Sequence, residues 1–140
     1  MHLKSSEEKE TEQARAVFKD YLTGLDTLGK ADLYVEIHAS IRPQSAMAIE
    51  MAECGFSKTE IENLKKAYRG PFPILMEPID SIYFHAQGAK KRGTLAKYPR
   101  CLHFELPSGL YEGESTMEES AQAIAQLIRS LEAEKRKEVL

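Results

Sequence analysis

The fold is decided by residues 33–42 of this 140-residue chain, which read Leu-Tyr-Val-Glu-Ile-His-Ala-Ser-Ile-Arg. Apolar side chains alternate there with side chains that carry a polar group, over all ten positions. A period of two is the pattern of a β-strand that buries one face. Pro43 follows, and proline has no backbone N–H to give to a sheet, so the strand is expected to end there. The other elements must therefore pack around a sheet with one apolar face.

Three later segments also favour β structure. Residues 74–77 form a short apolar run that Pro78 ends. Residues 79–87 and 101–106 each alternate between apolar and polar positions. The last segment sets Leu102, Phe104 and Leu106 against Cys101, His103 and Glu105. We therefore predict about four strands.

Four segments have the residue spacing of amphipathic helices. They are residues 6–23, 43–54, 57–70 and 115–131. Capping boxes are expected at Ser5 with Glu8 and at Ser57 with Glu60, and Pro43 suits a first helical turn. Gly24 and Gly55 are expected to end the first two helices. The first few residues and those after about 132, which are mostly charged, are expected to fray.

The resulting element order is α-β-α-α-β-β-β-α. An amphipathic helix needs an apolar surface, and one face of the sheet offers it. The sequence therefore predicts an α+β fold with a mostly antiparallel sheet of about four strands and helices packed on one face. The length fits a single domain over residues 1–140.

The composition is that of an ordinary globular protein, with 42% hydrophobic and 29% charged residues. The net charge of −3 argues against binding to nucleic acid or to an anionic membrane. Two cysteines, Cys54 and Cys101, are too few for a disulfide framework and are expected to be reduced and packed. Since the chain has neither a signal-peptide pattern nor an apolar run of about 20 residues, a cytoplasmic protein is expected.

Three histidines, His38, His85 and His103, fall on the polar phase of the expected strands. Imidazole, carboxylate and thiolate are zinc ligands, and histidine beside a carboxylate also suits acid–base chemistry. No two histidines have ligand spacing within one element, so we assign no metal ligands and no cofactor. His38, His103 and Glu105 are the candidate catalytic residues. The simpler interpretation is a polar face covered by water or by a second subunit.

His38-Ala39-Ser40-Ile41 resembles the His-x-Ser/Thr-x motif of the two-histidine phosphoesterases. The resemblance implies a phosphate held between two such motifs on facing strands. The second copy here is His103-Phe104-Glu105-Leu106, in which Glu105 replaces the hydroxyl residue. A carboxylate at that position repels a phosphate.

Residues 43–70 resemble a helix-turn-helix DNA reader, with the turn at Cys54-Gly55-Phe56. Several cations on the second helix are placed to meet phosphates: Lys58, Lys65, Lys66 and Arg69. Glu50 and Met51 depart from the motif, which has an apolar and a small residue there. A plain helical hairpin explains the same residues.

Residues 87–100 form a basic loop, and no acidic residue occurs between Ser81 and Phe104. Such a loop is suited to an anion, although a solvated hairpin has the same composition. The residues expected to bind a ligand come from this loop and from the polar phase of residues 33–42. They are Tyr34, Ser40, Arg42, Lys90, Lys91, Arg92 and Arg100.

No motif is specific enough to name a reaction. The leading hypothesis is a non-catalytic binding or regulatory protein, expected to be a homodimer, that holds a protein partner or a small anionic ligand. One alternative is a small enzyme that uses His38, His103 and Glu105 for acid–base chemistry on a phosphorylated or carbonyl substrate. A second alternative is a helix-turn-helix regulator that binds DNA.

Overall fold

The computed structural model describes the backbone of residues 12–43 and 47–138, and the side chains of 16–43, 47–91 and 93–138. Four strands are present in this part of the chain: β1 (Leu33–Ser40), β2 (Ile49–Cys54), β3 (Ile74–Met76) and β4 (Arg100–Pro107). The α-helices are α1 (Glu12–Thr27), α2 (Lys58–Ala67), α3 (Gln87–Arg92) and α4 (Glu114–Glu138). Two short 3₁₀ segments, η3 (Thr94–Lys97) and η4 (Ser108–Glu112), flank β4.

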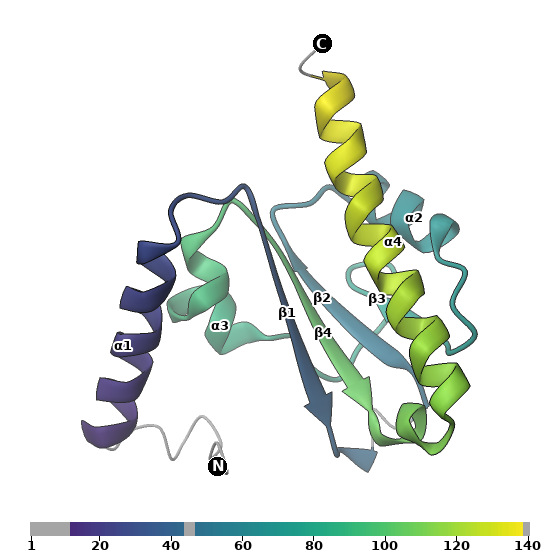
Figure 1. Ribbon diagram of the computed structural model, residues 1–140, viewed down its shortest axis with the longest axis horizontal. Helices are drawn as coiled ribbons and strands as arrows, with labels where there is room; N and C mark the ends of the chain where they lie inside the picture. Colours follow the sequence, from purple (N-terminus) through teal and green to yellow (C-terminus); the bar gives the residue numbers. More distant parts are fainter. Residues whose placement is uncertain (1–11, 44–46, 139–140) are drawn as a thin grey trace.

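The sheet is mixed and has the strand order β1-β4-β2-β3 (Figure 1). β1 pairs with β4 and β2 pairs with β3 in parallel, and only β2 and β4 are antiparallel. The α+β class and the four-strand sheet are confirmed, but the prediction of a mostly antiparallel sheet is wrong. The reason is that β4, the last strand in the chain, enters the sheet between β1 and β2.

The segment predicted as the helix 43–54 contains strand β2 instead. Ile49 and Met51 are fully buried on one side of the sheet, and Ala52 is buried on the other. Because β2 lies within the sheet and is buried on both faces, apolar side chains such as Met51 and Ala52 follow one another, so its sequence does not alternate cleanly and resembles that of a buried helix. The predicted element order is therefore wrong at this point.

Residues 79–87, predicted as a strand, contain no strand. The backbone N–H groups of Tyr83 and Phe84 donate to the carboxylate of Glu50, at 2.7 and 3.1 Å. This segment therefore finds its hydrogen-bond acceptor in a side chain of β2 rather than in a neighbouring strand. Helix α3 follows directly, at Gln87.

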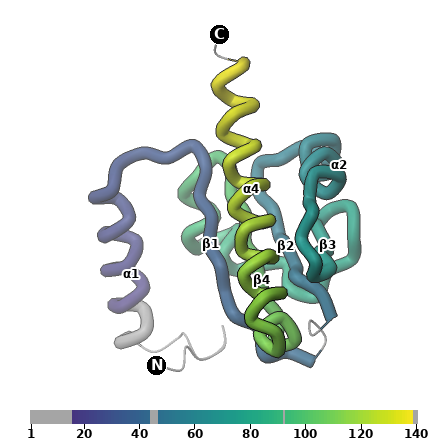
Figure 2. The backbone as a smooth tube through the Cα atoms, turned by 45° about the vertical axis from the view of Figure 1, so that its right-hand side comes forward, coloured from purple at the N-terminus to yellow at the C-terminus, as the bar shows by residue number. Residues whose placement is uncertain are grey.

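Helices α2 and α4 cover the first face of the sheet, which we call the apolar face (Figures 1 and 2). Its core consists of buried side chains from β2, β3, β4, η4 and the two helices. They are Ile49, Met51, Ile61, Leu64, Ile74, Met76, Leu102, Phe104, Leu110, Ile124, Leu127 and Leu131. This layer explains why α2 and α4 are amphipathic, since each presents one apolar stripe to the sheet.

The opposite face, which we call the polar face, is covered only in part, by α3 and η3. A second, smaller cluster lies there and contains Ala52, Ile82, Ala86, Leu95 and Cys101. The prediction that helices pack on one face only is therefore incomplete. Helix α1 packs on neither main layer and lies beside the sheet, on the β1 side (Figure 1).

The helix ends agree in part with the sequence. The capping box of Ser57 and Glu60 is confirmed at the start of α2. Helix α1 runs through Gly24 to Thr27, so the stop predicted at Gly24 is wrong. Helix α4 extends to Glu138, and fraying after about residue 132 stays a prediction. The expected Ser5–Glu8 box lies outside the described residues. Within the described helices, none is long and apolar enough to cross a membrane.

Candidate functional site

The polar side chains of β1 and β4 meet because the two strands run parallel in a fixed register. Glu36 is paired with His103, and His38 is paired with Glu105. These four residues alternate with apolar ones in both strands, so all four point to the polar face. We call them the histidine–carboxylate cluster. Its members come from strands 67 positions apart in the sequence.

His103 lies at the centre of the cluster and is only 3% exposed. Its Nδ1 is 2.7 Å from Oε1 of Glu36, and its Nε2 is 3.0 Å from Oε1 of Glu105. A carboxylate oxygen can only accept, so both ring nitrogens carry a proton when both hydrogen bonds are made. His103 is thus held between the carboxyl groups of Glu36 and Glu105.

The hydrogen bonds within the cluster shift the pKa values of His103 and Glu36 in opposite directions. Burial alone would lower the pKa of His103, but hydrogen bonds to Glu105 and Glu36 outweigh it and raise the pKa above the ordinary value. Burial alone would raise the pKa of Glu36, but hydrogen bonds from His103 and His38 bring it far below the ordinary value. Glu36 is therefore ionised.

Glu36 is further fixed by two hydroxyl groups that donate to its second oxygen. The Tyr34 hydroxyl lies 3.2 Å from Oε2, and the Thr94 hydroxyl lies 3.1 Å from it. Tyr34 is itself stacked on Tyr98, with ring centroids 4.6 Å apart, and its hydroxyl lies 3.0 Å from that of Tyr21. These contacts tie the carboxylate of Glu36 to η3 and to α1.

His38 is the accessible member of the cluster, since its side chain is 46% exposed. Its ring stacks on that of His103, with centroids 4.5 Å apart, and its Nε2 is 3.7 Å from Oε2 of Glu36. Phe84 packs against the ring of His103 at 5.0 Å, and the guanidinium of Arg42 lies 4.5 Å above Phe84. The cluster thus has a buried base and one open side.

The arrangement of donor atoms is one that a divalent metal ion can use. Glu36, His38 and His103 each offer one ligand atom, and these atoms all lie within 4.8 Å of one another. Ligand atoms around a tetrahedral zinc ion are roughly 3.4 Å apart, given metal–ligand distances near 2.1 Å. The exposed His38 ring is the member of the three with the most freedom to move towards that spacing.

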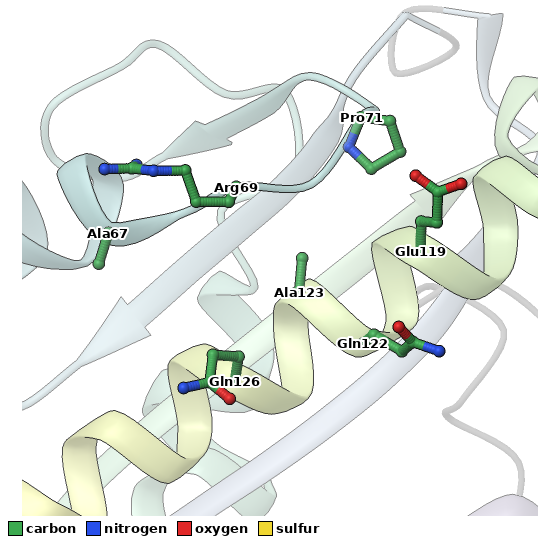
Figure 3. A pocket seen from close by; sticks show the side chains of 7 residues that line it. All are labelled: Ala67, Arg69, Pro71, Glu119, Gln122, Ala123 and Gln126. Atoms are coloured by element: carbon green, nitrogen blue, oxygen red, sulfur yellow. The ribbon is translucent and has the colours of Figure 1, made fainter.

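Acid–base catalysis has less support in this geometry. The structure brings His38, His103 and Glu105 together, but both nitrogens of His103 are already bonded to carboxylates. Two hollows, of about 390 and 250 Å³, lie elsewhere. The first, shown in Figure 3, is lined by α4 and the end of α2, and the second by α2 and Ile79. Neither is lined by a residue of the cluster.

The residues expected to bind an anion do not form one group. Tyr34 and Ser40 lie on the polar face. Tyr34 donates to Glu36, and Ser40 accepts from the backbone N–H of Arg42. Lys90 forms an ion pair with Glu77. Lys91 is exposed, and the side chain of Arg92 lies outside the described residues.

Arg100 belongs to the other side of the sheet. It bonds Glu60 at the start of α2 at 3.0 Å and lies over the ring of Phe56. Lys97, also in the basic loop, forms a 2.6 Å ion pair with Asp26 of α1. Much of the positive charge of this loop is therefore matched within the same molecule.

His85 and the cysteines also lie apart from the cluster's donor atoms. His85 bonds Glu77, with Nδ1 at 3.0 Å from Oε1. Cys54 and Cys101 are both free thiols and are paired across β2 and β4. Burial raises the pKa of Cys101 to about 12, so its thiol stays protonated.

Sequence reasoning placed Glu36 on the polar phase but did not select it, and it passed over Thr94 and Glu50. The signal for Glu36 was available, because it lies two residues before His38 on the same strand face. The sequence carries no signal that Thr94 contacts Glu36 or that Glu50 contacts residues 83–84. Both contacts join segments that are far apart in the sequence, so they depend on the tertiary fold.

The helix-turn-helix hypothesis lacks its first helix, since residues 49–54 are strand β2. Comparison of the chain with protein-family models, curated proteins and solved structures finds no match. The geometry of the histidine–carboxylate cluster is therefore the observation from which a function has to be argued.

Proposed function

We propose that the protein binds a divalent transition-metal ion of the zinc type through Glu36, His38 and His103. The observation that carries the proposal is the convergence of one carboxylate and two imidazole donors within 4.8 Å of one another. Two histidines and one glutamate are a known ligand set for zinc, and they leave one position for water or another ligand.

The surroundings of the three ligands support a metal site. A histidine that ligates a metal through one nitrogen usually gives its other N–H to a carboxylate, which fixes the ring. Glu105 stands in that position, at 3.0 Å from Nε2 of His103. The hydroxyls of Tyr34 and Thr94 hold Glu36 in the same way. In the absence of metal, a proton lies between His103 and Glu36, and a metal ion replaces it.

A cation fits this site better than the small anion expected from the sequence. Glu36 and Glu105 lie within the cluster, and Glu50 is buried opposite Glu105 on the neighbouring strand β2. The ionised carboxylate of Glu36 attracts a cation and opposes an anion. The protein thus fits the non-catalytic binding class, with a metal ion as ligand.

The test is calorimetric titration of the chelator-treated, full-length protein with zinc chloride. We expect one ion per chain and a rise of several degrees in Tm when zinc is in large excess over Kd. His38→Ala removes an exposed ligand and is expected to weaken binding at least tenfold.

The matched control is His85→Ala, which removes a histidine of similar exposure that bonds Glu77 instead. This variant is expected to bind zinc as the wild type does. Wild-type protein that gives no binding heat and no Tm shift would contradict the proposal. Equal loss of affinity in the two variants would also contradict it.

A further inference from the structure

We infer that the outer edge of β1 is an interface at which a second copy of this chain adds its own β1, antiparallel, about a two-fold axis at Ile37. β1 lies at the end of the sheet, and within the described residues no strand pairs with its outer side. An open edge offers a row of N–H and C=O groups to another strand.

The two edges of the sheet differ in how they are protected. β3, at the other edge, is three residues long and is flanked by Pro73 and Pro78. Short length and nearby prolines are common protections against edge pairing. β1 is eight residues long and contains no lysine, proline or glycine. Its edge therefore has none of these protections.

The second half of β1 exposes large apolar side chains. Ile37 is 55% exposed, and Ile41, just after the strand, is 84% exposed. The polar contacts of α1 lie at Tyr34 and at Lys97, near the start of β1 and in η3. They leave residues 37–39 uncovered, and the burial of these residues agrees, since all three are exposed.

The difference between the two faces of β1 limits which residues of the two copies can pair. A partner strand shifted by one residue would place apolar side chains on the polar face, so residues must pair odd with odd. With the axis at Ile37, Val35 faces Ala39 of the second copy, and Leu33 faces Ile41. Ile37 then contacts its own counterpart, and all these side chains lie on the apolar side.

Hydrogen bonding favours the same register on the polar side. With the axis at Ile37, Glu36 faces His38 of the second copy, and His38 faces Glu36. An axis at Glu36 would instead oppose two carboxylates, and an axis at His38 would oppose two imidazoles. An imidazole N–H can donate to a carboxylate across a strand pair, whereas two facing carboxylates repel each other, so this pairing favours Ile37 as the axis.

Disulfide trapping tests this register directly, in a Cys54→Ser background that leaves Cys101 buried. In the predicted dimer, two Ile37→Cys residues face each other with Cα atoms about 5 Å apart, which is within disulfide range. Mild oxidation with glutathione disulfide is expected to convert most of this variant into a covalent dimer. The matched control is Ile41→Cys, which is more accessible than Ile37 and whose two copies lie about 27 Å apart; it is expected to stay mostly monomeric on a non-reducing gel.

Sedimentation equilibrium supplies the second measurement. Wild type is expected to be a dimer at micromolar concentration, and Ile37→Lys a monomer with an unchanged circular dichroism spectrum. A monomeric wild type would overturn the inference, and so would cross-linking of Ile41→Cys as fast as Ile37→Cys. Both measurements are made without metal, so their outcome is separate from that of the zinc titration.

Discussion

His103 is held between Glu36 and Glu105, and the two carboxylates have different parts in the proposed site. Glu36 is a ligand, whereas Glu105 bonds the nitrogen that faces away from the metal. Glu105→Gln keeps the shape and the hydrogen-bond acceptor but removes the charge that makes the imidazole a stronger donor. We expect zinc affinity to fall roughly 10–100-fold, as for other carboxylates of this kind.

The same titration calorimetry measures this effect, and the matched control is Glu62→Gln on α2, whose side chain is 41% exposed. An unchanged Kd in Glu105→Gln would show that Glu105 is not coupled to the ligand. A complete loss of folding, checked by circular dichroism, would instead assign it a structural role.

The stability of the folded protein is expected to depend on pH through Asp80, which lies outside the histidine–carboxylate cluster. Burial alone would raise its pKa, but the ion pair with Lys65 and the backbone N–H of Met76 lower it below the ordinary value. A depressed pKa in the folded state means stability that is present above the unfolded-state pKa, near 4, and is lost as the pH falls through the folded-state pKa.

Asp80→Asn is therefore expected to cost about 1–2 kcal/mol of unfolding free energy at pH 7. The difference from wild type should narrow as the pH falls from 5 towards 3. Urea unfolding at several pH values measures this. A difference that stays constant over that range would show that the charge of Asp80 contributes little.

At this scale the sequence predicts that some members of the cluster share one face of the sheet, and their proposed roles stay predictions. His38, His103 and Glu105 were selected because alternation in two strands gives their side chains one face, and these three do meet. Glu36 was placed on the same face but was not selected, because its part in the cluster depends on its contact with His103. That neighbour is set by the pairing of β1 with β4, which alternation within one strand does not specify.

Among the elements, the turn between β2 and α2 requires a glycine at position 55. Gly55 has φ +82°, and a Cβ placed there would lie 2.0 Å from the backbone oxygen of Pro99. Gly55→Ala is therefore expected to destabilise the protein by roughly 2 kcal/mol or more. It would displace residues 99–100, which begin β4.

Gly24→Ala is the matched substitution within a helix. Gly24 lies inside α1, and nothing lies within 4 Å of an added Cβ. Alanine is a better helix former than glycine, so the unfolding free energy should rise by about 0.5–1 kcal/mol. Thermal unfolding of both variants checks the pair, and a similar change of the same sign in both would contradict the prediction.

The elements with strong local signals were predicted correctly. Helix α2 carries its own start signal in Ser57 and Glu60, and β1 and β4 alternate over their length. The segments that failed depend on tertiary contacts. Most of residues 49–54 are buried on both sides because β2 is central, so their pattern does not alternate. Tyr83 and Phe84 bond a buried carboxylate, Glu50, that no local pattern connects to them.

For the whole molecule, the class was predictable and the topology was not. Amphipathic helices and one alternating strand imply helices on a sheet, which is what the structure has. Strand order depends on how the long connections between strands pass over the sheet. Here β1 pairs with β4, which lies 67 positions later in the sequence. Local patterns carry no information about a pairing at that distance.

The strand order has a consequence for how the chain folds as it is synthesised. Of the four described strands, β4 is made last, and it lies between β1 and the β2–β3 pair, so no strand joins β1 to that pair until β4 has been added. A ribosome-bound chain that ends before β4 therefore holds β1 as a single strand and β2–β3 as a separate pair, each with open edges. Contacts between distant segments form slowly because closing a long loop costs entropy. The nascent chain thus depends on residues 100–107 to join these strands into one sheet.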